Sequence, residues 1–175
     1  DFQIEGMSIR DSLLDYVTEE IIIKNSYHIY KNKDFVSFVN FARPESLYDG
    51  YQVSYKNKDK KYIIYSLEGI KLFKDNINDC EVLRKQIVNE LKYLFSNPSV
   101  EENIGEISDG DPSGKSKVNI SRFYLNKDLN REDIQISCYD WAEGFKFEDG
   151  SLAVDKLTVS IVTQEFLEFL KNEYN

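Results

Sequence analysis

A succession of strand-like segments is the feature of this sequence that most constrains its fold. These segments are rich in β-branched and aromatic residues and are bounded by turn residues. After a short strand at 2–5, they lie at 27–31, 35–41, 51–56, 62–73, 117–125, 133–140, 145–147 and 152–162. Strands and helices do not alternate regularly along the chain, so parallel βαβ units are not expected. The sequence therefore predicts an α+β fold built on an antiparallel sheet.

Helices are expected at a few places around these strands. The longest one is capped by Asn76, carries apolar residues three and four apart from Cys80 to Leu94, and ends before Pro98. We expect the antiparallel sheet to pack against this long central helix. A short N-terminal helix is predicted after Ser8, and a short C-terminal helix after Thr163. Residues 19–24 fit either a helix or a strand.

The length of 175 residues is typical of one domain, so residues 1–175 are expected to form a single α+β domain. Residues 97–115 are rich in Gly, Ser, Asp and Pro and are predicted to be a loop. A division into two subdomains would fall within this loop.

The charge of the chain bears on its partners. There are 31 acidic against 22 basic residues, a formal net charge of −9. A surface with this balance repels nucleic-acid backbones and anionic lipids, so nucleic acid is not expected as a partner. No run approaches the roughly 18 apolar residues of a transmembrane helix, so we do not expect the chain to span a membrane.

The two cysteines of the chain are both predicted to face the core. Cys80 lies on the apolar face of the predicted long helix, and Cys138 shares a strand face with Ile134 and Ile136. We therefore predict a Cys80–Cys138 disulfide, which would close a loop of about 59 residues and contribute roughly 4 kcal/mol in the chain-entropy model. The alternative is two buried free thiols in a cytosolic protein.

Several motifs spread along the chain resemble a family of small exported proteins of marine alphaproteobacteria to which no chemistry is assigned. They are Gly6-Met7-Ser8-Ile9, Asp11 to Tyr16, Asn78-Asp79-Cys80, Ser113 to Ser116, and Cys138-Tyr139-Asp140-Trp141. Members usually begin with a secretory signal and have Gly where this chain has Arg10. The resemblance implies that Asp1 lies near a mature N-terminus and that the protein is periplasmic or otherwise exported. A cytoplasmic location is the alternative, since the sequence begins without a signal peptide.

The Gly-x-Ser-x-x-Asp helix entry also resembles, in pattern alone, small envelope proteins of the outer-membrane assembly lipoprotein and β-lactamase-inhibitor type.

Two ligand motifs occur in incomplete form in the predicted loop. Gly114-Lys115-Ser116 lacks the earlier Gly of a P-loop, because that position is Asp109, and a strand follows instead of a helix. Asp109, Asp111 and Ser113 match the first ligand positions of an EF-hand calcium loop, but the position of the bidentate Glu is Ile120. We interpret the segment as an ordinary turn and expect neither a metal nor a cofactor.

No catalytic residue is singled out by the sequence. His28 is the only histidine, which excludes zinc sites that need two, and no nucleophile motif accompanies it. It is interpreted as a strand histidine among tyrosines. With 31 acidic residues, a carboxylate pair remains open.

The segment Tyr139-Asp140-Trp141 is the candidate for a ligand or partner site, since aromatic side chains at strand ends bind sugars and peptides. The sequence favours a non-catalytic, exported envelope or periplasmic domain that binds a protein or a small ligand. A small carboxylate-dependent hydrolase and an inhibitor-like module are the alternatives.

Overall fold

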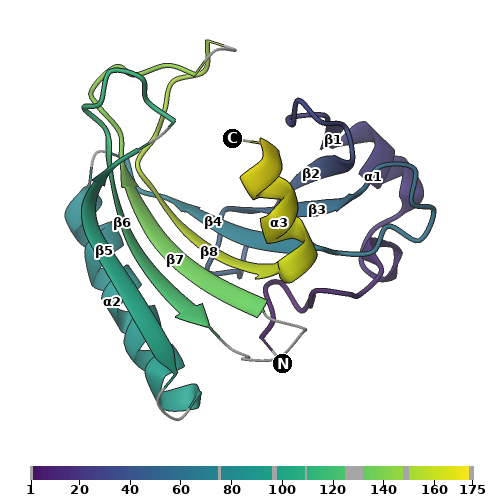
Figure 1. Cartoon of the computed structure of the whole chain (residues 1–175), viewed down its shortest axis with the longest axis horizontal. Coiled ribbons are helices and arrows are strands. Elements are labelled where there is room, and N and C mark those ends of the chain that lie inside the picture. Colours follow the sequence, from purple (N-terminus) through teal and green to yellow (C-terminus); the bar gives the residue numbers. More distant parts are fainter. Residues whose placement is uncertain are drawn as a thin grey trace. The chain divides into compact units, whose positions relative to one another are not determined.

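The computed structural model describes residues 2–74, 76–95, 98–108, 110–124, 132–147 and 150–173. Eight strands form a sheet in the order β1-β2-β3-β4-β8-β7-β6-β5 (Figure 1). The strands are β1 (Ser26–Tyr27), β2 (Phe35–Phe41), β3 (Gly50–Lys56), β4 (Ser66–Leu72), β5 (Ser99–Ile107), β6 (Lys117–Tyr124), β7 (Glu132–Asp140) and β8 (Lys156–Thr163). The helices are the 3₁₀ turn η1 (Leu13–Asp15), α1 (Glu19–Lys24), α2 (Ile77–Leu94) and α3 (Gln164–Glu173). The predicted α+β fold with an antiparallel sheet is confirmed.

The chain divides into two compact units. The first comprises Asp1–Ile70, Asn126–Asp133 and Ser160–Asn175, and the second comprises Lys71–Leu125 and Ile134–Val159. By these bounds, strands β4, β7 and β8 contribute residues to both units. The segment 97–115 lies inside the second unit.

An aromatic cluster joins α3 to the strands of the first unit. Phe166 and Phe169 of α3 pack against Tyr30 and Phe35, and all four side chains are buried. The Phe35 and Phe169 rings lie 4.7 Å apart between centroids. The predicted cap is also present, because the Thr163 hydroxyl accepts a hydrogen bond from the Phe166 amide. The C-terminal helix is therefore held by a continuous aromatic core.

The prediction of an N-terminal helix after Ser8 is wrong. Asp11 does accept a hydrogen bond from the Ser8 amide at 2.8 Å, as a capping box requires, but Arg10 takes a left-handed φ of 72°. A left-handed residue stops an α-helix, so only the short turn η1 forms. This backbone region is the one that Gly occupies without strain.

The prediction that the sheet packs against a long central helix is confirmed only in part. The sheet is large, and α2 is neither long nor central to it. Helix α2 has 18 residues and lies against one part of the sheet. Its buried face runs through Cys80, Arg84, Val88 and Leu91, whereas the predicted core residue Leu94 is 66% exposed.

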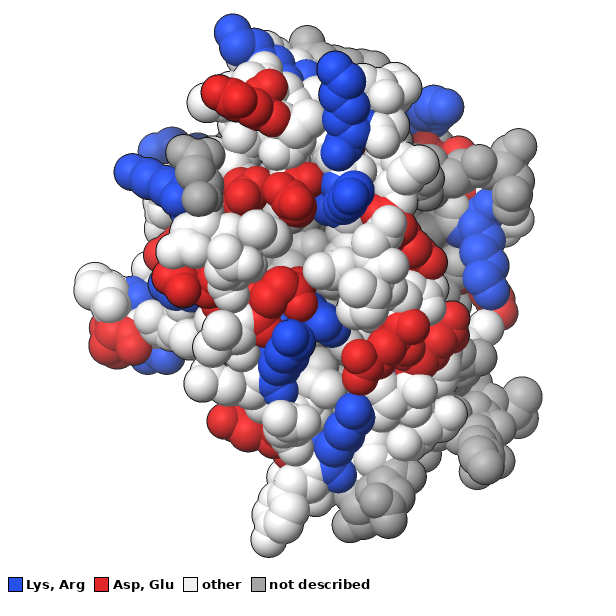
Figure 2. Space-filling model, turned by 90° about the vertical axis from the view of Figure 1, so that its left-hand side faces the viewer, with Lys and Arg blue, Asp and Glu red and all other residues white. Residues whose placement is uncertain are grey.

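The segment 97–115 was expected to be a loop, but it contains β5, which pairs antiparallel with β6 at the edge of the sheet. The pairing is irregular between Asn103 and Glu106, where Gly105 has a φ of 72°. Glu101, Glu102 and Glu106 keep this edge charged. Figure 2, which faces the side where α2 and β5 lie in Figure 1, shows acidic and basic side chains interspersed. A bulge and charges protect an open sheet edge from pairing with another chain.

Other strand boundaries also differ from the prediction. Residues 62–65 precede β4, and Tyr62 has a φ of 48°. Of the predicted strand 27–31, only Tyr27 lies in a strand, the two-residue β1 that begins at Ser26. Gly69 pairs with β3 in continuous register, and a Cβ at Gly69 would lie 2.7 Å from the Tyr48 ring. The predicted strand 145–147 is reduced to a single bridge between Lys146 and Leu152. Residues 127–131, between the predicted strands 117–125 and 133–140, lie outside the described residues.

Candidate functional site

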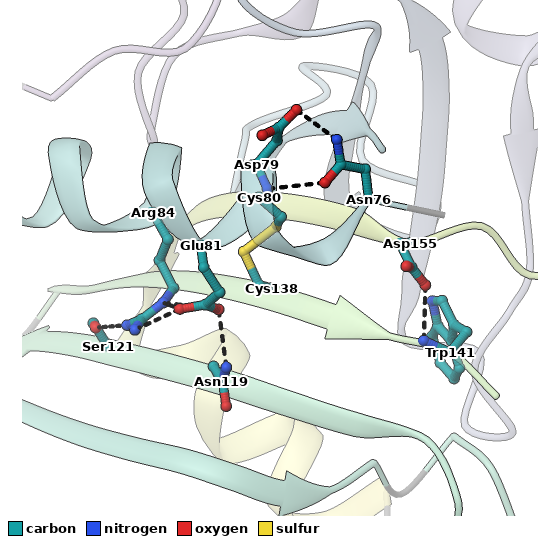
Figure 3. The surroundings of a disulfide bond; sticks show 10 residues. All are labelled: Asn76, Asp79, Cys80, Glu81, Arg84, Asn119, Ser121, Cys138, Trp141 and Asp155. Carbon is teal, nitrogen blue, oxygen red and sulfur yellow. Dashed lines mark hydrogen bonds and ion pairs between the residues drawn. A yellow bond between two sulfur atoms is a disulfide. The ribbon is translucent and has the colours of Figure 1, made fainter. Parts of the chain in front are cut away.

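The predicted Cys80–Cys138 disulfide is present and joins α2 to β7 (Figure 3). The two Cα atoms are 6.0 Å apart and both side chains are buried. Ile134 and Ile136 alternate with Cys138 on the same face of β7 and are fully buried. The bond therefore holds β7 against α2 two residues before the strand ends at Asp140.

Four aromatic side chains gather where β7 ends, and we call them the Trp141 cluster: Tyr139, Trp141, Phe145 and Phe147. The Trp141 ring is stacked with the Tyr139 ring and with the Phe145 ring, with centroids 5.6 and 5.4 Å away and planes tilted by 10° and 11°. Phe147 meets the edge of Trp141 at 5.1 Å. Parallel and edge-on contacts of this kind stabilise aromatic pairs beyond their buried area.

The peptide chain at Trp141 is fixed by side chains from outside the cluster. The Trp141 amide donates to Asp155 Oδ1 at 2.9 Å (Figure 3), and the Ala142 amide donates to Ser116 Oγ at 2.9 Å. Asp155 and Ser116 are both buried, so these hydrogen bonds are shielded from water. The backbone that carries the indole is consequently held at two successive amides.

Asp111 organises the loop that supplies Ser116. Its carboxylate accepts hydrogen bonds from the amide and hydroxyl of Ser113 and from the amide and hydroxyl of Ser116, the last at 2.6 Å. These bonds, that from the Ser116 hydroxyl foremost, hold the pKa of Asp111 well below its usual range, although burial acts in the opposite direction.

The candidate calcium loop is this same segment. Asp109, its first position, lies outside the described residues, and the Asp111 oxygens are used by the two serines. In the described part of the chain no group of three or more His, Cys, Asp or Glu side chains is placed to hold a metal.

The Trp141 cluster is partly exposed to solvent. Tyr139, Trp141 and Phe145 are half-buried, Phe147 is 37% exposed, and Asp140 points to solvent. Lys156 places its ammonium 5.3 Å from the centre of the Tyr139 ring. The Trp141 Nε1–H is buried and has no hydrogen-bond partner among the residues that the structure describes. A buried donor without a partner is rare and costs free energy.

The structure adds two kinds of residue that sequence reasoning missed. Phe145 and Phe147 had been interpreted as a strand, and their alternation before the turn at Gly150 is the sequence signal that could have placed them together. Gly110 carries no signal of its own, yet a Cβ there would lie 3.1 Å from the Trp141 ring. A side chain at Gly110 would therefore fit only if the indole moved by a few tenths of an ångström.

Glu165 and Glu168 are two carboxylates that the structure brings together, but neither is buried as a hydrolase would need. Glu165 and Glu168 line a cavity of about 560 Å³ in the first unit, together with Arg10. Both are exposed, Glu165 is paired with Lys56, and Glu168 accepts a hydrogen bond from Gln164. Exposed and paired carboxylates lack the dry surroundings that tune such groups for acid–base chemistry. His28 is also exposed and lies outside the strands.

Comparison of the chain with protein-family models, with curated proteins and with solved structures finds no match in any of the three. The site is therefore interpreted from its own geometry.

Proposed function

We propose that this chain is an exported, non-catalytic binding domain that takes a protein or a small ligand on the Trp141 cluster. The observation that carries this proposal is the partly exposed stack of Tyr139, Trp141 and Phe145, whose backbone is fixed before any ligand arrives. A stack that is already ordered loses little conformational freedom when a flat or apolar group docks on it. Asp140 adds a charged group beside the rings.

The partly exposed rings of the cluster favour a ligand that presents a flat or apolar face. The Trp141 Nε1–H is buried and is not offered to such a ligand. The aromatic side chains of peptides and the apolar faces of neutral sugars both meet this requirement. These are the two ligand classes that the proposal names.

The exported location rests on the disulfide. Disulfides persist in oxidising compartments and are rare in the cytosol. No helix in the described ranges has the length and apolar character needed to cross a membrane.

An inhibitor-like module is the second candidate, and one observation favours it. The segments 145–147 and 150–153 are paired, because the Phe147 amide donates to the Ser151 carbonyl and the Ala153 amide donates to the Phe145 carbonyl. Phe147 and Leu152 are exposed on these segments, and Leu152 is 59% exposed. Paired segments that expose apolar side chains in this way can enter the cleft of another protein.

Intrinsic fluorescence tests the proposal directly, because Trp141 is the only tryptophan of the chain. We expect a shift of its emission on titration with an aromatic peptide library or with neutral oligosaccharides. Phe147→Ala removes a partly exposed ring while leaving the stack in place, and is expected to weaken binding by about tenfold. Trp141→Ala should abolish binding, as followed by calorimetry.

Tyr93→Ala is the matched control, since Tyr93 is 91% exposed on α2 and lies outside the cluster. It should bind as the parent does. Equal loss of binding in Tyr93→Ala and Phe147→Ala would contradict the site. Hydrolytic turnover that vanishes when Glu165 and Glu168 are replaced by Gln would contradict the non-catalytic function itself.

A further inference from the structure

The first unit holds a second cavity whose lining has a different chemistry from the Trp141 cluster. Its volume is about 320 Å³. Met7, Val17 and the rings of Tyr16 and Tyr51 supply an apolar and aromatic lining, and Glu5 adds a carboxylate. This volume suits a ligand near the small end of the range that protein pockets accept.

Glu5 is the carboxylate of this cavity, and Arg43 lines the cavity as well. The Glu5 side chain is only 10% exposed, and it accepts a hydrogen bond from the Ser46 hydroxyl. Arg43 approaches it at 3.5 Å through Nε, but Arg43 is 69% exposed and also lies 3.8 Å from Glu45. One guanidinium is thus shared between two carboxylates, which leaves a local excess of negative charge.

The tyrosines of this cavity remain neutral phenols, because the pKa of each is raised. Burial, first of all, raises the pKa of Tyr51, and the charge of Glu5 contributes to the shift. Tyr16 donates a hydrogen bond to Asp11, and this bond raises the pKa of Tyr16 to about 12. Tyrosine ring faces carry negative electrostatic potential and attract cations within about 6 Å. The cavity therefore combines a carboxylate with aromatic rings, as sites for organic ammonium groups do.

We propose that this cavity binds a small organic amine, with the ammonium group on Glu5 and the carbon body against Met7, Tyr16 and Tyr51. The net charge of −9 on the chain favours the approach of such cations. The amine could be a free metabolite or the side chain of an exposed lysine on a peptide. Both present the same ammonium on an apolar stem.

Titration of the full chain, followed by backbone amide shifts in NMR spectra at low salt, tests this proposal. The probes are phenethylamine, its neutral isostere 2-phenylethanol, the anion phenylacetate, and Nα-acetyl-lysine methylamide for the peptide-borne source. Phenethylamine should shift amides near Glu5, Tyr16 and Asn40 and should bind at least about tenfold more tightly than 2-phenylethanol. A response to the lysine derivative alone would identify the peptide source and would still support an amine site.

Three variants separate charge from shape. Glu5→Gln keeps the shape of the side chain and should weaken phenethylamine binding by about tenfold. Glu45→Gln is the matched control, because Glu45 pairs with the same arginine but does not line the cavity. It should change the affinity less than Glu5→Gln does. Arg43→Gln removes the competing cation and should tighten binding.

The proposal is overturned if phenethylamine and 2-phenylethanol both bind with the same measurable affinity, if phenylacetate binds best, or if no probe shifts these amides. Equal effects of Glu5→Gln and Glu45→Gln would also overturn it. The Trp141 cluster lies in the other unit and shares no residue with this cavity, so these outcomes leave the proposed function untouched.

Discussion

Asp111 shows at the scale of one residue how a carboxylate can order a loop without a metal. Four hydrogen bonds from Ser113 and Ser116 converge on its two oxygens. The hydroxyl of Ser116 then accepts from the Ala142 amide, next to Trp141. A short chain of hydrogen bonds therefore connects Asp111 to the backbone of the candidate site.

The depressed pKa of Asp111 predicts a pH dependence of stability. Because its pKa is lower in the folded than in the unfolded chain, the ionised carboxylate contributes stability above the unfolded value of about 3.9. That contribution is lost as the pH falls through the folded pKa. Asp111→Asn should therefore be less stable than the parent at pH 7, and the difference should shrink below about pH 4.

Urea unfolding at a series of pH values measures this difference. Ser116→Ala should reproduce part of the effect, because it removes the hydrogen bond that lowers the pKa of Asp111 most. Glu90→Gln, at an exposed position of α2, is the control. A pH-independent difference between Asp111→Asn and the parent would contradict the prediction.

At the scale of an element, α2 carries a buried ion pair in place of a purely apolar face. Arg84 is 3% exposed, pairs with Glu81 at 3.0 Å, and donates to the Ser121 hydroxyl of β6 at 2.6 Å (Figure 3). Glu81 in turn accepts from the Asn119 amide at 2.9 Å. These contacts dock the middle of the helix on β6 through polar groups.

Glu81→Ala is expected to destabilise the fold by about 2 to 3 kcal/mol, because it leaves the buried Arg84 guanidinium without its carboxylate. Adding Arg84→Met in the same chain should restore most of that loss, since a well-packed apolar side chain often replaces a buried pair without cost. Urea unfolding of the single and double variants gives both values. Lys85→Ala, at an exposed neighbouring position, should have little effect. If the stability losses caused by Glu81→Ala and Arg84→Met simply added up in the double variant, the two residues would not act as an ion pair.

At the scale of the whole molecule, the disulfide joins segments 58 positions apart in the sequence. Cys80→Ala/Cys138→Ala is expected to lower the free energy of unfolding by about 4 kcal/mol, mainly by freeing the unfolded chain. The denaturant m-value should rise as well, because the unfolded state becomes less compact. Reduced parent protein should match the double variant in urea unfolding. A loss well below about 1 kcal/mol would show that the bond contributes little to the fold.

Much of the sheet could be predicted because its strands are rich in β-branched and aromatic residues. Strands β2, β3, β6 and β7 appear close to their expected bounds. The disulfide followed from periodicity, which places Cys80 and Cys138 on core faces of their elements. The strand β5 was missed because an edge strand rich in Glu, Asn and Gly carries little apolar signal.

The candidate site was predicted only in part. Tyr139 and Trp141 share a strand face by period-two alternation, and their stacking follows from it. Phe145, Phe147 and Gly110 reach the indole through the paths of two loops, which local periodicity does not encode. Glu5 and Tyr51 meet in the amine cavity for the same kind of reason, since they are distant in sequence and adjacent only in the fold.

The sequence by itself determined the α+β class, the antiparallel pairing of the central strands and the cysteine pair, because periodic burial is written into neighbouring residues. Tertiary structure alone decided that Arg10 ends a helix before it forms, that Arg84 is buried, and that Glu5 shares one arginine with Glu45. These features depend on contacts and backbone turns whose free energy comes from partners remote in the chain. Local propensity is a weak prior where such partners exist.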